Sequence, residues 1–271
     1  MSQVVRDFYN ASPSHEWERL ARPYRRLEFV STMYLIEKYF PPSGHVVDVG
    51  CGPGRYSVEL MRRGYRVTLV DLTEGLLDIA KEQIAAEGLK AEAVVRADAC
   101  CLDFLPGESI DAALLMGPLY HLVKPEDRKQ ALFETRRILR TGGVAIVAYL
   151  NSWGILRSLL TEVPAYYKDL DVIYNLTREY TQVGYQKGGF TEAYFTVPPA
   201  AKADLESAGF EVVSYAGVES FCSGSLDPVK AIHDSDPEAY RNILKVAAEL
   251  CEAPQYRDST EHLHFVLRKP G

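Results

Sequence analysis

The stretch His45-Val-Val-Asp-Val-Gly-Cys-Gly-Pro-Gly-Arg-Tyr56 joins a buried-strand pattern to a glycine-rich turn. Three of its first five residues are valines, whose β-branched side chains suit a strand that is covered on both faces. The glycines that follow permit a turn too tight for Cβ atoms, and Pro53 stands where a helix would begin. The stretch therefore predicts a strand that turns sharply into a helix, with Asp48 just before the turn.

The spacing of the glycines indicates what this turn binds. A dinucleotide-binding loop has the pattern G-x-G-x-x-G, and a phosphate-binding P-loop ends in Gly-Lys followed by Ser or Thr. Here the pattern is G-x-G-x-G, and no Gly-Lys-Ser or Gly-Lys-Thr follows Gly54. Asp48 would repel a polyphosphate, but its carboxylate suits a cofactor that carries an ammonium group and a sulfonium.

Four further strand patterns follow, with helical patterns between them. The second strand ends in Asp71, which follows Gly50 by about the 20 residues expected for a ribose-binding acid in a doubly wound fold. Residues 125–139 carry apolar side chains at helical spacing, and Thr141-Gly142-Gly143 is expected to end that helix. Alternating strands and helices imply a parallel sheet with its ligand at the carboxyl ends of the strands. The predicted strands are Arg66–Asp71, Ala93–Asp98, Asp111–Gly117 and Gly143–Tyr149.

On these residues the chain resembles the class I S-adenosylmethionine-dependent methyltransferases. Their first motif has the form Asp/Glu-x-Gly-x-Gly-x-Gly at the end of the first strand, and Asp48 to Gly54 match it. The resemblance covers residues 45–150 closely and residues 210–269 more loosely. It implies S-adenosyl-L-methionine as the cofactor and an α/β fold. The expected sheet is doubly wound, seven-stranded and mostly parallel, with an antiparallel last strand and helical lid inserts.

The resemblance also implies which residues bind the cofactor. Asp71 would accept hydrogen bonds from both ribose hydroxyls, and Asp98 would lie beside the adenine amino group. Tyr9 and Arg26 match an N-terminal tyrosine and a nearby arginine that approach the methionine end in many relatives, although aromatic packing and a surface arginine would equally explain them. The expected set is Asp48, Gly50, Cys51, Gly52, Gly54, Asp71, Leu72, Asp98, Ala99, Met116, Tyr9 and Arg26.

The chemistry is expected just past the fourth strand, in the segment Met116-Gly-Pro-Leu-Tyr-His-Leu122. Methyl transfer is an in-line displacement with a good leaving group, so the protein mainly aligns a nucleophile, excludes water and, when required, removes a proton. His121 could act as the base, because an ordinary histidine is largely neutral near pH 7, and Tyr120 could orient the acceptor. Alternatively, both residues anchor the loop and the helix that follows it.

The segments outside the minimal fold are expected to determine the acceptor. Residues 1–44 predict an N-terminal helical cap over the cofactor mouth, and residues 45–150 the cofactor-binding core. Residues 151–198 form a lid insert rich in aromatic side chains, which suits a small organic substrate. Residues 199–271 complete the sheet and carry a helical insert, with a helix from about Pro237 to Cys251 that Ser235 or Asp236 would cap.

Composition narrows the partners. The 271 residues are 47% hydrophobic and carry a net charge of -7, which offers no general attraction for nucleic acid. The arginines at 19, 22, 25 and 26 lie among the glutamates at 16, 18 and 28 and predict a helix surface. Five cysteines without a C-x-x-C pair indicate a reducing, cytoplasmic location and no metal site, and no apolar run approaches the ~20 residues that span a bilayer. The oligomeric state does not follow from the sequence.

We therefore expect a methyltransferase that acts on an oxygen, nitrogen or sulfur atom of a small molecule. Enzymes that methylate amino groups of nucleic-acid bases carry Asn/Asp/Ser-Pro-Pro-Tyr/Phe after the fourth strand, whereas this chain has Met-Gly-Pro-Leu, residues 116–119. Two alternatives stay open. One is an RNA or protein methyltransferase whose acidic partner is steered by the arginines of residues 19–26, and the other is a non-catalytic S-adenosylmethionine-binding regulatory protein.

Overall fold

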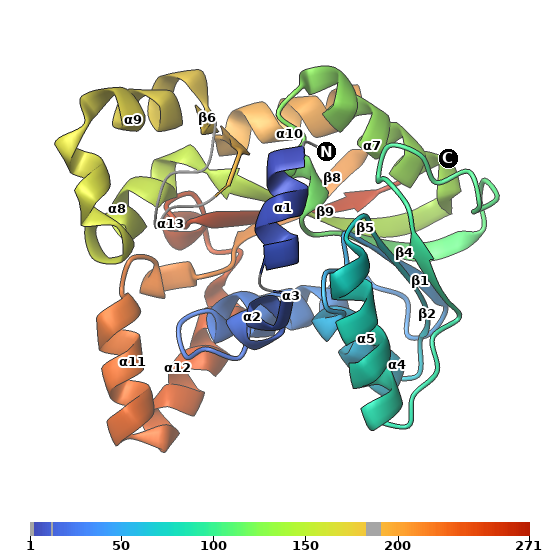
Figure 1. Cartoon of the computed structure of the whole chain (residues 1–271), viewed down its shortest axis with the longest axis horizontal. Helices are drawn as coiled ribbons and strands as arrows, with labels where there is room; N and C mark the ends of the chain where they lie inside the picture. Colours follow the sequence, from blue (N-terminus) through green and yellow to red (C-terminus); the bar gives the residue numbers. More distant parts are fainter. Residues whose placement is uncertain (1–2, 12, 183–190) are drawn as a thin grey trace.

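The computed structural model describes residues 3–11, 13–182 and 191–271. Its central sheet lies between two layers of helices (Figure 1). Seven strands follow the order β3-β2-β1-β4-β5-β9-β8, in which β1 to β5 are parallel and β9 is antiparallel to both of its neighbours. This confirms the predicted doubly wound fold with an antiparallel last strand. The seven strands are β1 (His45–Val49), β2 (Arg66–Asp71), β3 (Ala93–Arg96), β4 (Ile110–Leu115), β5 (Leu139–Asn151), β8 (Glu211–Gly217) and β9 (His262–Arg268).

Two short strands that the sequence did not predict extend the sheet inside the lid insert. These are β6 (Thr181–Gln182) and β7 (Ala193–Thr196). β7 pairs in parallel with the last two residues of β5, and β6 pairs antiparallel with β7. The lid is therefore joined to the carboxyl edge of the sheet by backbone hydrogen bonds, although residues 183–190 lie outside the described part.

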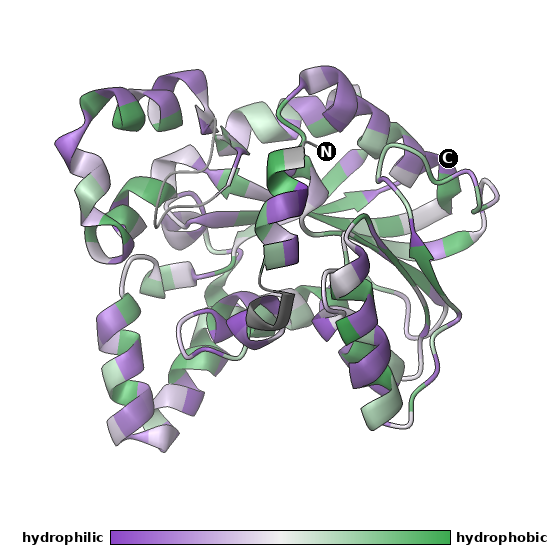
Figure 2. Ribbon diagram, in the orientation of Figure 1, coloured by the Kyte–Doolittle hydropathy of each residue, from purple (hydrophilic) through white to green (hydrophobic). Residues whose placement is uncertain are grey.

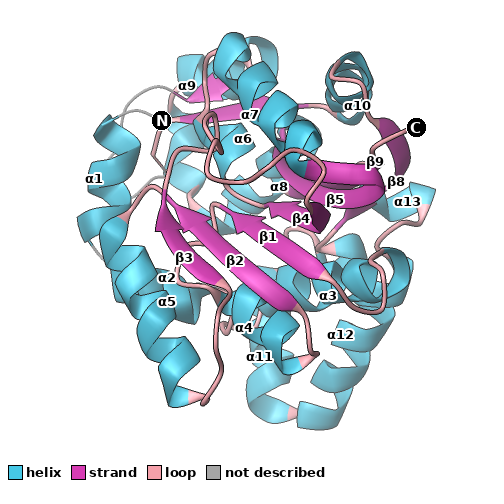
Figure 3. Cartoon of the chain, turned by 90° about the vertical axis from the view of Figure 1, so that its right-hand side faces the viewer, coloured by secondary structure: helices cyan, strands magenta, loops and turns pink. Residues whose placement is uncertain are grey.

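Helices cover both faces of the sheet (Figure 3). Alternation along β1 sends Val46 to the core that includes α3, α4 and α5, and sends Val47 and Val49 to the core under α7 and α10. β1 is thus buried on both sides, as its valine-rich sequence predicts, whereas the edge strand β3 is only partly buried. The helices of these layers are α3 (Arg26–Tyr39), α4 (Arg55–Arg62), α5 (Glu74–Ala86), α6 (Pro118–His121), α7 (Pro125–Ile138) and α10 (Pro198–Ser207).

The connection between α7 and β5 differs from the prediction. The helix ends at Ile138, and the chain enters β5 directly at Leu139, which pairs with Ile110 of β4. Gly142, with φ of 78°, therefore lies within the start of the strand and does not end the helix. Its backbone N–H donates to the carbonyl oxygen of Lys269 after β9. Gly142 and Gly143 therefore belong to an irregular start of β5. The helix ends because the chain that follows it pairs with β4.

A helix of the N-terminal segment packs against a helix of the C-terminal insert on one side of the core. In Figure 1, α3 from the N-terminal segment lies beside α12 (Pro237–Leu250). Leu27 of α3 and Ala247 of α12 belong to one apolar cluster that is separate from the two main cores. Asp236 caps α12 by accepting hydrogen bonds from the backbone N–H groups of Glu238 and Ala239, as predicted. The remaining helices are α1 (Gln3–Ala11), α2 (Pro13–Arg19), α8 (Ser152–Glu162), η1 (Pro164–Lys168), α9 (Leu170–Tyr174), η2 (Asn175–Glu179), η3 (Ser220–Cys222), α11 (Leu226–Ser235) and α13 (Pro254–Arg257).

Hydropathy follows this layered arrangement. In Figure 2 the strands of the sheet are largely hydrophobic, and the outer turns of the helices are hydrophilic. Among the residues that the structure describes, no helix combines the length and the apolar character needed to cross a membrane.

Close packing at Gly154 fixes the lid to the sheet, and we expect Gly154→Ala to destabilise the protein. A Cβ atom at this position of α8 would lie 1.8 Å from the backbone oxygen of Thr260, so α8 or the start of β9 would have to move. We expect the free energy of unfolding, measured in urea, to fall by about 2–3 kcal/mol. Gly107→Ala is the control, because its nearest contact would be 3.5 Å. Equal stabilities of the two variants would contradict the expected overlap.

Candidate active site

The turn after β1 is held against β2 by the backbone. The N–H groups of Gly50 and Cys51 both donate to the carbonyl oxygen of Val70, at 2.8 and 3.0 Å. A Cβ atom on Gly50 would lie 2.4 Å from Cδ of Pro118 in α6, so only glycine fits there. At Gly52, with φ of 53°, a Cβ atom would meet nothing within 4 Å, which leaves the turn open on the side where a ligand would lie.

A cavity of about 100 Å³ opens over this turn, at the carboxyl edge of the sheet. We call it the smaller cavity. It is bounded by the turn after β1, the end of β2, the segment after β4, and side chains from α1 to α3. Among its lining residues are nine of the predicted site residues: Asp48, Gly50, Cys51, Gly52, Asp71, Met116, Tyr120, His121 and Tyr9.

Asp48 is the predicted site residue whose surroundings best fit a bound cation. Its side chain is 1% exposed, and its Oδ2 atom accepts a hydrogen bond of 2.6 Å from the hydroxyl of Ser57 in α4. Its Oδ1 atom is buried and has no hydrogen-bond partner among the residues that the structure describes. Burial, together with the nearby charge of Asp71, raises the pKa of Asp48 to about 7, against the effect of Ser57. A buried carboxylate oxygen of this kind fits the ammonium group of S-adenosylmethionine.

Asp71 organises the turn as well as lining the smaller cavity. Its Oδ2 accepts from the backbone N–H of Gly52, and its Oδ1 accepts from the backbone N–H of Thr73, both at 2.8 Å. Burial raises the pKa of Asp71, and these hydrogen bonds act in the opposite direction. Each carboxylate oxygen has a second lone pair, so the residue could still accept bonds from ribose hydroxyls.

Five of the predicted site residues do not line the smaller cavity. Gly54, with φ of 83°, begins α4, and a Cβ atom there would lie 3.0 Å from Ala80. Asp98 follows β3 and accepts a hydrogen bond from the backbone N–H of Cys100. The guanidinium of Arg26 lies over the ring of Phe29, 4.4 Å from its centroid. The five are Gly54, Leu72, Asp98, Ala99 and Arg26.

His121 is joined to the N-terminal cap. Its Nδ1 atom lies 3.2 Å from the carbonyl oxygen of Glu192, and its Nε2 atom lies 2.8 Å from the hydroxyl of Tyr9. Because a carbonyl only accepts, Nδ1 carries the hydrogen and Nε2 accepts from Tyr9. Burial lowers the pKa of His121 to about 4, so the ring is neutral near pH 7. Its basic nitrogen thus faces Tyr9.

A second cavity of about 330 Å³ adjoins the first, and we call it the larger cavity. Tyr9, Glu16, Arg19 and Tyr120 line both cavities, so these four side chains mark the junction. One wall of the larger cavity is apolar and comes mainly from the lid and the end of β5. It consists of Leu150, Ile155, Leu159, Val163, Tyr166, Leu176 and Phe195.

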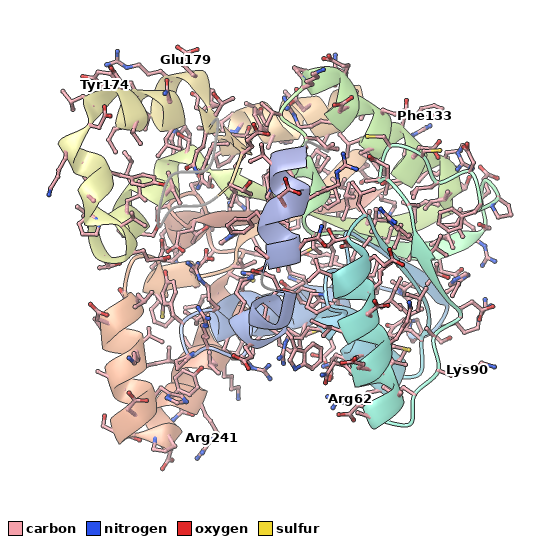
Figure 4. All side chains as sticks on the ribbon, in the orientation of Figure 1. Arg62, Lys90, Phe133, Tyr174, Glu179 and Arg241 are labelled. Atoms are coloured by element: carbon pink, nitrogen blue, oxygen red, sulfur yellow. The ribbon has the colours of Figure 1, made fainter. Side chains whose placement is uncertain are left out.

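The opposite wall of the larger cavity is charged, which corrects the prediction that the arginines of residues 19–26 form a helix surface. Arg19, Arg22 and Arg25 line this cavity. Arginines such as Arg62 and Arg241, by contrast, project from the periphery of the molecule in Figure 4. The three lie at the end of α2 and in the turn between α2 and α3. The cap places this turn over the carboxyl edge of the sheet, so the three side chains line the cavity.

Ion pairs hold this charged wall together. Arg19 lies 2.8 Å from the buried carboxylate of Glu28 and 3.2 Å from that of Glu16. Arg25 joins the cap to Glu162 of the lid and, at 3.0 Å, to Glu261 just before β9. The sequence analysis missed Arg19 as a site residue. The run of arginines and glutamates over residues 16–28 was the signal for it, and such charge runs also occur on solvated helices.

One cluster beside the larger cavity has the composition of a metal site. Among the described residues, Glu219, Glu261 and His262 bring one potential ligand atom each to within 4.8 Å of one another. Their atoms already have partners, however. Arg25 and the hydroxyl of Tyr24 donate to Glu261, and Nδ1 of His262 lies 2.6 Å from Glu219. A cationic guanidinium in contact with the cluster disfavours a metal ion, so we describe it as a hydrogen-bonded network.

Comparisons with known proteins agree with this geometry. A family model described as a methyltransferase domain matches residues 46–143. The tRNA 5-carboxymethoxyuridine methyltransferase of Escherichia coli K12 is 23% identical, over 85% of this chain and 82% of its own length. The ubiquinone biosynthesis O-methyltransferase of Coxiella burnetii is 24% identical, over 80% and 82%.

Solved structures share the fold. The 1,6-didemethyltoxoflavin-N1-methyltransferase of Burkholderia thailandensis, solved with S-adenosylhomocysteine bound, superposes with a TM-score of 0.59 and 18% identity, over 99% of this chain and 88% of that one. The matched segment 46–143 contains the glycine-rich turn, Asp48 and Asp71. Residues 46–143 therefore form a methyltransferase domain of the class I S-adenosylmethionine-dependent type.

Proposed function

We propose that the protein transfers a methyl group from S-adenosylmethionine to an oxygen, nitrogen or sulfur atom of a small molecule in the larger cavity. The observation that carries this proposal is the junction of the two cavities at Tyr9, Glu16, Arg19 and Tyr120. A volume of about 330 Å³ is within the range of small-molecule pockets, and its apolar wall suits an organic acceptor. The bound cofactor would supply a sulfonium methyl group and a good leaving group.

Within this proposal, the chain's residues position the reactants. Asp48 would hold the ammonium group of the cofactor, and Asp71 its ribose. Tyr9 and Tyr120 would face the point of transfer, with Tyr120 fixed by donating to the carbonyl oxygen of Met116 at 3.0 Å. His121 would orient Tyr9 by accepting the hydrogen bond from its hydroxyl. In this arrangement Tyr9 would face the acceptor, and His121 would act on the acceptor only through Tyr9.

The competing acceptor is RNA, because the relative from Escherichia coli bears the name of a tRNA methyltransferase. Against RNA, Arg19 and Arg25 are engaged by glutamates inside the cavity and are not displayed to a phosphate backbone. The test measures S-adenosylhomocysteine release with phenols, carboxylic acids, amines and thiols, and in parallel with unfractionated tRNA. Turnover with a small acceptor supports the proposal and excludes a purely regulatory protein. Turnover with tRNA alone would refute it.

A further inference from the structure

A histidine and a glutamate that the sequence analysis did not single out form a buried pair at the larger cavity. His262 is the first residue of β9 and lies opposite Leu150, near the carboxyl end of β5. It therefore belongs to the edge of the sheet where ligands of this fold bind. Glu219 follows β8, and it is only 1% exposed. His262 lines the larger cavity, whereas Glu219 lies behind it.

Glu219 contacts His262 through both of its carboxylate oxygens. Its Oε1 atom lies 2.6 Å from Nδ1 of the imidazole, and its Oε2 atom accepts from the backbone N–H of His262 at 3.2 Å. The carboxylate only accepts, so Nδ1 is the donor and Nε2 is the basic atom of the neutral ring. This arrangement matches the orienting carboxylate of a general base. It contrasts with His121, whose Nε2 atom is engaged by Tyr9.

The charges around His262 favour a strong base. Burial alone would lower the pKa of His262, but the charge and hydrogen bond of Glu219, helped by Glu28, outweigh burial and raise it. Arg25 acts in the opposite direction. Glu261, the preceding residue, and the buried His264 also interact electrostatically with His262. Glu28 also lines the smaller cavity, whereas His262 lines only the larger one.

We propose that His262, oriented by Glu219, is the general base that deprotonates a hydroxyl group of the acceptor. The acceptor's O–H bond breaks and its proton moves to Nε2 of His262, which forms an imidazolium ion paired with Glu219. The acceptor oxygen then forms its bond to the methyl carbon as the carbon–sulfur bond breaks, and S-adenosylhomocysteine leaves. The inference rests on the proposed function and narrows the acceptor to a hydroxyl compound with an apolar body.

A chromogenic phenol tests the inference without turnover. The S-adenosylhomocysteine complex is titrated with 4-nitrophenol, whose phenolate absorbs visible light and whose neutral form does not. At a pH about one unit below the probe's own pKa, we expect the bound probe to be roughly tenfold more ionised than the free probe, because His262 takes its proton. A bound probe that stays neutral, or one that does not bind, would overturn the inference.

Three variants test whether His262 itself takes the proton of the probe. His262→Asn keeps a donor for Glu219, and we expect it to lose the phenolate signal. Glu219→Gln removes the negative charge that strengthens His262 as a base. We therefore expect the pH at which the bound probe is half ionised to rise by about one unit. His233→Asn is the matched control, because His233 lies 2.8 Å from Asp234 in an exposed pair on α11. An unchanged signal in His262→Asn would refute the role of His262.

Calorimetry on the same samples distinguishes failure of this inference from failure of the proposed function. If S-adenosylhomocysteine binds to the unmodified chain but the bound probe remains neutral, the proposed methyl transfer stands and only the base is wrong. If S-adenosylhomocysteine does not bind, the proposed function fails, and the inference fails with it.

Discussion

We expect the Asp48→Asn variant to bind S-adenosylmethionine roughly 100-fold more weakly than the unmodified chain. Removing one partner of a buried, hydrogen-bonded charge pair costs about 2–5 kcal/mol, and 1.4 kcal/mol is about tenfold in affinity. Asp48 meets the conditions for such a loss, because it is 1% exposed and its Oδ1 atom has no partner in the described part of the chain. Isothermal titration calorimetry measures the effect, and Asp103→Asn, an exposed carboxylate, is the control.

The pH dependence of binding tests whether Asp48→Asn loses affinity because it lacks the negative charge of the carboxylate. The pKa of Asp48 is raised to about 7 in the free protein, so the carboxylate becomes protonated as the pH falls below 7. Binding of an ammonium group then weakens by up to about tenfold per pH unit. We expect this dependence between pH 8 and pH 6 in the unmodified chain and its absence in Asp48→Asn. Equal dependence in both would assign the pH effect to another group.

We expect Asp48→Asn to raise the stability of the cofactor-free protein, although it weakens binding of the cofactor. A folded-state pKa of about 7, against about 3.9 in the unfolded chain, gives a penalty that is absent below pH 4 and complete above pH 7. Its size is about 4 kcal/mol. We therefore expect cofactor-free Asp48→Asn to be more stable at pH 8 by about 2–4 kcal/mol. Lower stability would show instead that the variant loses affinity because it is misfolded.

The sequence predicted those parts of the site that depend on local chemistry. Asp48 and the glycine-rich turn occupy consecutive positions, and the conformation of each glycine follows from its own backbone geometry. The second acid, Asp71, could be assigned because one strand and one helix of regular length separate it from Gly50. The alternating strands and helices likewise indicated a parallel sheet, whereas the seven-stranded form with an antiparallel last strand was implied by the family resemblance.

The larger cavity could not be predicted in this way. Its charged wall joins Arg25 of the cap to Glu162 of the lid and to Glu261 before β9, residues more than a hundred positions apart. His262 and Glu219 meet only because β8 and β9 are neighbours in the sheet. The turn containing Glu219 and the strand containing His262 carry no local sign of a shared role in the sequence, so tertiary packing alone reveals it.

The ion pair between Arg19 and Glu28 gives the second large expected effect. Burial would raise the pKa of Glu28, but Arg19 and the nearby His262 lower it to about 2. Compared with an ordinary glutamate, this shift stabilises the folded protein by about 3 kcal/mol above pH 4.5, and the contribution is lost as the pH falls through 2. We expect Arg19→Met to lower the free energy of unfolding at pH 7 by about 3–5 kcal/mol, because Glu28 keeps a buried charge without its partner.

Two comparisons identify the cause of that loss. Arg62→Met removes an arginine of α4 whose exposed ion pairs with Glu59 and Glu87 contribute about 1 kcal/mol at most, so its stability should hardly change. Arg19→Met combined with Glu28→Gln removes the stranded charge and should recover much of the stability. If the double variant is as unstable as Arg19→Met, the loss reflects packing of the arginine stem. Urea unfolding at pH 7 and pH 3 decides, since the gap between the unmodified chain and Arg19→Met must narrow in acid as Glu28 becomes protonated in the variant.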